Sequence, residues 1–167
     1  MPGGGGTIMK KKLLVLCTIL ACFLCGCQEN KKSVSMYDLC QKMEAADSSL
    51  PSMLYASSAE EDAEDLFTNI SDLDYKKVDS FFVSYAEEGG KADEIAVIAV
   101  KNTADTEEAK KSLEAHKESR RKLLDQYEPE EVSRIKDGVI FTSGQYAVFI
   151  VSENSDAVRK AFEEAIK

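Results

Sequence analysis

The stretch EIAVIAVK, from Glu94 to Lys101, decides the fold of this chain. Between its two charged ends lie only β-branched residues and alanines, with no polar residue. A strand with one solvated face would alternate apolar and polar residues. The unbroken apolar run therefore predicts a strand that is covered on both faces or is central in a sheet.

The elements on either side of this strand follow from turn and cap signals. A strand is predicted over Val78–Ala86, and the loop Glu87–Ala92, with two adjacent glycines, joins the two strands as a hairpin. Asp105 and Glu108 have the spacing of a capping box and predict a helix over Thr106–Tyr127. The apolar residues expected on its buried side are Ala109, Leu113, Leu123, Leu124 and Tyr127.

A similar arrangement follows later in the chain. Strands are predicted over 138–142 and 145–152, joined by a tight turn at Ser143-Gly144, and a last helix runs to Ile166. The segment AVFIVSENSD, residues 147–156, aligns without a gap with AVIAVKNTAD, residues 96–105. This echo indicates two ββα units, although any buried strand that leads into a capped helix would look alike.

Two helices are predicted before the first strand, over 35–46 and 59–70, the second opened by a capping box at Ser58 and Glu61. Residues 35–167 are thus expected to form a single α+β domain with a four-stranded antiparallel sheet. If the two units are related by a pseudo-two-fold axis, the most apolar strands are neighbours, and the strand order is 1-2-4-3. All helices are expected on one face of the sheet.

The N-terminal region has the pattern of an export signal. Three lysines precede the apolar run Leu13–Leu24, which is shorter than the roughly 20 residues of a membrane-spanning helix. Leu24, Cys25, Gly26 and Cys27 resemble the lipobox of bacterial lipoproteins. The resemblance implies lipidation of the Cys27 thiol, cleavage before Cys27 and acylation of its new amine by a chain such as palmitate. The alternatives are an ordinary cleaved signal or a buried core helix.

On this interpretation residues 1–27 are a signal peptide, with Met9 as the expected true start, and residues 28–34 are a polar tether. The domain is expected to lie on the outer face of the cell membrane, with the lipid membrane as a partner through Cys27. Three of the 21 basic residues leave with the signal and all 30 acidic ones remain, so the mature net charge is −12. This charge argues against nucleic acid as a partner.

Several residues resemble an uncharacterised lipoprotein family of Gram-positive bacteria that is classified as a domain of unknown function. The resemblance lies in the order of Asp93-Glu94-Ile95-Ala96-Val97, the long charged helix before Pro129, Gly144-x-Tyr146 and a last helix with Phe162. It implies the location and the fold and carries no activity, and Asp93, Glu94, Gly144 and Tyr146 are the expected family-motif surface. The chain departs from the family pattern at Gln145, where Asn is expected, and at His116, where Arg is expected.

The mature chain holds few residues suited to catalysis. His116 is the only histidine, and its spacing places it at a helix–sheet margin, either as a general base or as a partly exposed helix residue. Cys40 is the one cysteine left after lipidation. With His116 it could form a nucleophilic pair, but no motif brings the two together, and its apolar helical stripe predicts a buried, inert thiol. One histidine and one free cysteine are too few for zinc, and the sequence predicts no catalytic residue, metal or cofactor.

Three functions remain open. The first is a non-catalytic module that binds a protein or another component of the cell envelope. The second is a small-solute receptor that feeds a transporter, for which 140 residues are few. The third is an enzyme that uses carboxylates such as Asp93 or Glu94, although each is expected to begin a strand and face solvent.

Overall fold

The structure is a computed structural model that describes residue 1 and residues 34–167. The expected lipobox, from Leu24 to Cys27, and residues 28–33 of the tether lie outside the described residues. Among the described residues, no helix is both long and apolar enough to cross a membrane.

The centre of the domain is one antiparallel sheet in the order β1-β2-β3-β5-β4. The strands are β1 (Met53–Ser57), β2 (Val78–Ala86), β3 (Glu94–Val100), β4 (Val139–Ser143) and β5 (Tyr146–Val151). The predicted order of the four expected strands is confirmed, and so are the two hairpins. Gly144 has φ +57°, the left-handed conformation that its tight turn requires.

The prediction of four strands is wrong, because β1 adds a fifth at one edge. β1 pairs with β2, and Leu54 lies opposite Tyr85. No element is predicted for these five residues from sequence, because a short run behind Pro51 carries too little periodicity to identify a strand. Only pairing with the longer β2 holds it in place.

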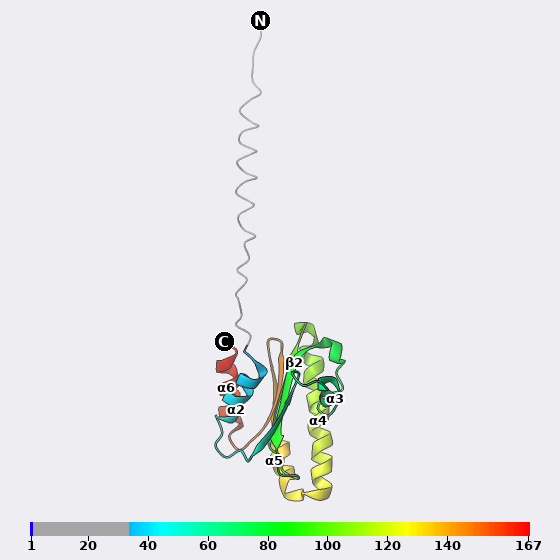
Figure 1. Cartoon of the computed structure of the whole chain (residues 1–167), viewed down its shortest axis with the longest axis vertical. Coiled ribbons are helices and arrows are strands. Elements are labelled where there is room, and N and C mark those ends of the chain that lie inside the picture. The colour runs from blue at the N-terminus through cyan, green and yellow to red at the C-terminus, as the bar shows by residue number, and fades with distance from the viewer. Residues whose placement is uncertain (2–33) are drawn as a thin grey trace. The chain divides into compact units, whose positions relative to one another are not determined.

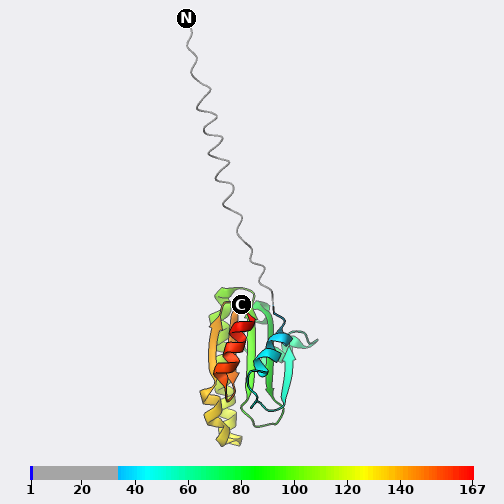
Figure 2. The same cartoon turned by 90° about the vertical axis from the view of Figure 1, so that its left-hand side faces the viewer.

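Helices cover both faces of the sheet, so the prediction that all of them pack on one face is wrong. Figure 1 shows α2 and α6 on one side of the sheet and α3 and α4 on the other. Figure 2 shows α2 and α6 side by side over their face. The helices are α2 (Met36–Glu44), α3 (Ala63–Thr68), α4 (Thr106–Tyr127), α5 (Val132–Asp137) and α6 (Ser155–Ala165). Short 3-10 turns span Tyr75–Lys77, Thr103–Asp105 and Pro129–Glu131.

The physical reason is the central strand β3, in which all seven residues are buried. Its side chains alternate between two cores. Ala96, Ile98 and Val100 face the core beneath α3, α4 and α5. Ile95 and Val97 face the core beneath α2 and α6. Two apolar faces need two layers of helices, so the domain has three layers.

The internal echo holds for the strands only. Val97 lies opposite Val148 in the sheet, and a two-fold axis through this pair, perpendicular to the sheet, relates the strands as the echo aligns them. Such an axis would leave the two following helices on the same face. Instead, α4 packs on one core and α6 on the other. The two ββα segments are therefore not related as whole units.

The two helices of one face are joined by a buried carboxylate. Asp47, just after α2, accepts hydrogen bonds from the backbone N–H and the side-chain amide of Asn154, both at 2.9 Å. The hydroxyl of Ser49 donates to the same carboxylate at 2.6 Å. Burial opposes ionisation, but the hydrogen bonds from Ser49 and Asn154 hold the pKa of Asp47 well below its usual range. This contact fixes the start of α6 against the end of α2.

The predicted capping boxes do not form. α3 begins at Ala63 rather than at residue 59, and the hydroxyl of Ser58 instead accepts a hydrogen bond from the backbone N–H of Phe81 at 3.3 Å. Because β1 pairs with β2, the Ser58 hydroxyl binds the backbone of β2 and does not cap a helix. α4 keeps its predicted bounds, but its Asp105 makes no side-chain cap, and Asn102 caps the preceding 3-10 turn.

Two residues expected on the buried side of α4 are exposed. Leu123 and Tyr127 are 58% and 70% exposed, whereas Ala109, Leu113 and Leu124 are buried as predicted. All five have the spacing of one helical side, but Leu123 lies at the edge of that side and Tyr127 is the last residue of α4.

Candidate functional site

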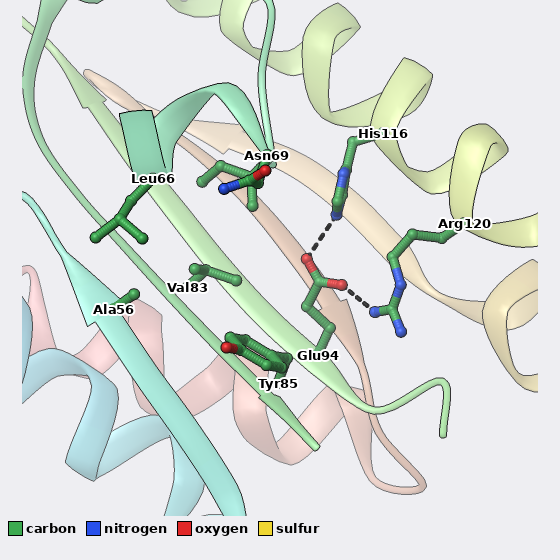
Figure 3. A pocket seen from close by; sticks show the side chains of 9 residues that line it. Ala56, Leu66, Asn69, Val83, Tyr85, Glu94, His116 and Arg120 are labelled. Atoms are coloured by element: carbon green, nitrogen blue, oxygen red, sulfur yellow. Dashed lines mark hydrogen bonds and ion pairs between the residues drawn. The ribbon is translucent and has the colours of Figure 1, made fainter. Parts of the chain in front are cut away.

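A pocket of about 290 Å³ opens on the sheet face between α3 and α4 (Figure 3). Its volume is at the lower end of the range for small-molecule sites. Its walls are mostly apolar, and Glu94, His116 and Arg120 lie together on one side. The lining residues are Ala56, Leu66, Asn69, Ile70, Val83, Tyr85, Glu94, His116 and Arg120.

The pocket exists because α3 is short. Six residues of helix span about 9 Å, whereas the nine residues of β2 span about 30 Å. Phe67 of α3 packs edge-on against Phe81, near the start of β2, with ring centroids 5.1 Å apart. Further along β2 the side chains of Val83 and Tyr85 line the open pocket instead.

Glu94, the first residue of β3, holds the charged side of the pocket together. Its Oε1 lies 2.8 Å from Nε2 of His116, and its Oε2 accepts a hydrogen bond from Nη1 of Arg120. His116 and Arg120 are one turn apart on α4, so both side chains reach down to the same carboxylate (Figure 3). The Glu94 residue is only 2% exposed.

Arg120 also fixes the loop of the β2–β3 hairpin. Its Nη2 donates to the carbonyl of Lys91 at 2.9 Å, and its Nη1 lies 3.5 Å from the carbonyl of Ala92. One guanidinium thus binds the carboxylate and the chain just before it. This geometry uses the fork of donors that distinguishes arginine from lysine.

The charge state of Glu94 follows from these partners. Burial alone would raise the pKa of Glu94, but the hydrogen bond from His116 and the positive charge of Arg120 together lower it. The carboxylate is therefore ionised at neutral pH, with a partner on each of its two oxygens. Such a carboxylate orients His116 and Arg120 rather than exchanging protons itself.

The expectation that Asp93 and Glu94 face solvent is wrong. Asp93 is also buried, and its Oδ1 accepts from Nη2 of Arg134 at 2.6 Å. Arg134 lies on α5, so the helical layer on this face supplies a cation to each of two adjacent carboxylates. Sequence reasoning missed these pairs because the partners are 22 to 41 residues away along the chain.

The other expected family-motif residues lie elsewhere. Gly144 and Tyr146 are at the opposite end of the sheet, where Ala99 rather than Glu94 pairs with Tyr146. The carbonyl of Gly144 accepts a hydrogen bond from the hydroxyl of Thr106 at 3.2 Å. The ring of Tyr146 packs edge-on against Phe162 of α6. The structure therefore does not bring the four residues into one site.

His116 and Cys40 cannot act together. His116 lies at the helix–sheet margin, as its spacing predicted, on the face that carries the pocket. Cys40 is buried in the core on the other face, as predicted, with its Sγ 3.3 Å from Oε1 of Glu44. Burial and the nearby charge of Glu44 raise the pKa of the Cys40 thiol far above its usual value. Within residues 34–167, no three His, Cys, Asp or Glu side chains are grouped to hold a metal ion.

Comparison with known proteins identifies a domain family. No curated protein and no solved structure is significantly similar to the chain. A domain family described as "Domain of unknown function (DUF4358)" matches residues 52–152. The matched region begins just before β1 and ends just after β5, so it contains the whole sheet, the pocket and the Glu94 cluster. The chain belongs to this family of DUF4358 domains.

Proposed function

We propose that this protein is a lipoprotein, anchored through Cys27 to the outer face of the cell membrane, whose domain is a non-catalytic binding module. Its binding site is the pocket between α3 and α4. One observation carries the proposal. The pocket is open and mostly apolar, and its one buried carboxylate already has a cationic or hydrogen-bonding partner on each oxygen.

Binding is favoured over catalysis by the way the charged groups are used. A general base needs a free lone pair within reach of a substrate proton. Glu94 is occupied by His116 and Arg120, and Arg120 also holds the hairpin loop. The cluster therefore gives the pocket a rigid, polar side. The apolar walls supply the area that a partner would bury.

Site-specific photo-crosslinking in intact cells tests this function. A photoreactive phenylalanine analogue replaces Tyr85 in the pocket wall or, as the matched control, Tyr37, an exposed tyrosine on the opposite face. We expect the Tyr85 position to crosslink to a defined envelope protein that the Tyr37 position does not capture. Equal crosslinking at both positions, or none at Tyr85, contradicts the proposal.

A second candidate, a small-solute receptor, is favoured by the size of the pocket. At about 30 Å³ per water-sized group, 290 Å³ holds roughly ten such groups. On this alternative, a solute would raise the melting temperature of the full chain, because it binds the folded state only. A panel of small metabolites measured by thermal shift distinguishes the two. If a metabolite raises the melting temperature of the wild-type protein but not that of the Tyr85→Ala variant, the small-solute receptor is favoured.

A further inference from the structure

We infer that the pocket receives the apolar side of a basic amphipathic helix from a partner protein. The inference rests on the proposed binding function and specifies its partner. It follows from three features of the same face: the extent of its apolar surface, an incomplete layer of helices, and a segment of unpaired acidic residues.

The apolar surface extends past the pocket itself. Leu54 and Tyr85 form an exposed pair across β1 and β2, and Tyr85 belongs to the pocket wall. Leu123 and Tyr127 continue the helical stripe of α4 that carries His116 and Arg120. Apart from Tyr37 and Met1, these four are all the large apolar residues that are exposed among the described ones. A small solute in the pocket would leave most of this surface uncovered.

The shape of the gap fits a helix. On this face α4 and α5 pack over the β3, β5 and β4 side of the sheet, while the six-residue α3 contacts β1. The later residues of β2 therefore lie where a helix would complete the layer. From His116 to Tyr127 the stripe on α4 runs about 16 Å, or three helical turns. A partner helix of that length would present residues at i, i+3, i+4 and i+7 to the groove.

The charge beside the pocket selects a basic partner. We use the name acidic segment for Glu60, Glu61, Asp62, Glu64 and Asp65, which lie at the start of α3, next to Leu66 of the pocket wall. All five are exposed, and none forms an ion pair within residues 34–167. In contrast, Glu118 and Glu114 of α4 have basic partners on the same helix. Lysine or arginine beside the apolar side of a partner helix would complement the acidic segment.

The test combines crosslinking with mapping of the crosslinked residues. The photoreactive analogue at Tyr85 is used in cells, and mass spectrometry identifies the partner segment that it reaches. The same experiment is repeated with Glu60→Gln, Glu61→Gln and Glu64→Gln in one chain. These side chains are exposed and unpaired, so the variant is expected to fold.

We expect the mapped segment to be helical, apolar on one side and rich in Lys or Arg. We expect the triple variant to reduce its crosslinking on the order of tenfold, because three exposed ion pairs contribute about a factor of two each. A mapped segment without this pattern, a crosslink to phospholipid, or a yield unchanged in the triple variant would overturn the inference. If the crosslink maps to a protein segment of another kind, this inference fails but the proposed function stands. The proposed function fails only if no protein crosslinks specifically at Tyr85.

Discussion

At the scale of single residues, Glu94 shows how burial and charge are balanced in this domain. A carboxylate at 2% exposure is costly unless its charge is compensated. His116 and Arg120 provide that compensation from one helix, so the ion pair also ties α4 to the start of β3. If either the Glu94 carboxylate or its two partners were removed, the remaining charge would be left partly buried without compensation.

Replacing Glu94 by Gln is therefore expected to lower the free energy of unfolding by about 3 kcal/mol. The amide keeps the shape of the side chain but loses its charge, and its N–H group would face another donor. Denaturant unfolding at neutral pH measures the change. Glu163→Gln is the matched control, because Glu163 pairs only with Arg159 on the exposed side of α6 and should cost less than about 0.5 kcal/mol.

The same variant is expected to change the dependence of stability on pH. The pKa of Glu94 is lower in the folded state than in the unfolded chain, so its contribution is complete above the unfolded pKa of about 4.3. That contribution is lost as the pH falls through the lower folded value, because the unfolded chain then binds more protons. Wild type should thus lose more unfolding free energy than Glu94→Gln between about pH 6 and pH 3. Parallel curves would show that Glu94 is not held ionised.

At the scale of elements, α5 ends close against β5, where Val151 of β5 pairs with Glu94 of β3. Gly138 ends α5 and begins the turn into β4. A Cβ added there would lie 2.8 Å from Cγ2 of Val151 and 3.1 Å from the carbonyl oxygen of Ile135. The residue has φ −55°, so the need for glycine comes from this packing and not from its backbone conformation.

Gly138→Ala should therefore destabilise the fold by about 1–3 kcal/mol, the usual cost of overpacking a core. Gly89→Ala is the control, since an added Cβ at this loop position meets no atom within 4 Å. Chemical denaturation of both variants gives the comparison. If the two variants were equally stable, α5 would not pack against β5 as closely as described.

At the scale of the whole molecule, the acidic domain and the proposed N-terminal lipid anchor together predict how the protein is attached to a membrane. If the signal peptide is cleaved before Cys27 as proposed, the remaining chain has a net charge of −12, which gives no attraction to anionic lipid, so the domain itself should not hold the protein at a membrane. Attachment would then depend on acyl chains at Cys27, each contributing about 0.8 kcal/mol per buried CH₂ group.

Cys27→Ser is expected to move the protein from the membrane fraction to the soluble fraction or the medium, because serine cannot carry the thioether-linked lipid. Cell fractionation and metabolic labelling with a palmitate analogue measure the change. Cys40→Ser tests specificity, since this thiol is buried in the core and should leave membrane attachment unaffected. Persistent membrane attachment of Cys27→Ser would show that another part of the chain binds the membrane.

The sequence by itself determined the α+β class, four of the five strands with their order, and the bounds of α4. These features depend on local signals: the apolar run of β3, the glycines of the two hairpin turns and Pro129 just after α4. It also placed Cys40 in the core and His116 at the helix–sheet margin, because helical spacing fixes which side of a helix a residue occupies.

Only the tertiary structure decided the rest. β1 is too short to be recognised without its partner β2, and the side of the sheet on which each helix packs depends on the path of its connecting loop. The pocket and the Glu94 cluster arise between elements far apart in the chain, where no local pattern records the contact. Burial of a charged residue such as Glu94 is a property of its partners, and those partners meet only in the folded domain.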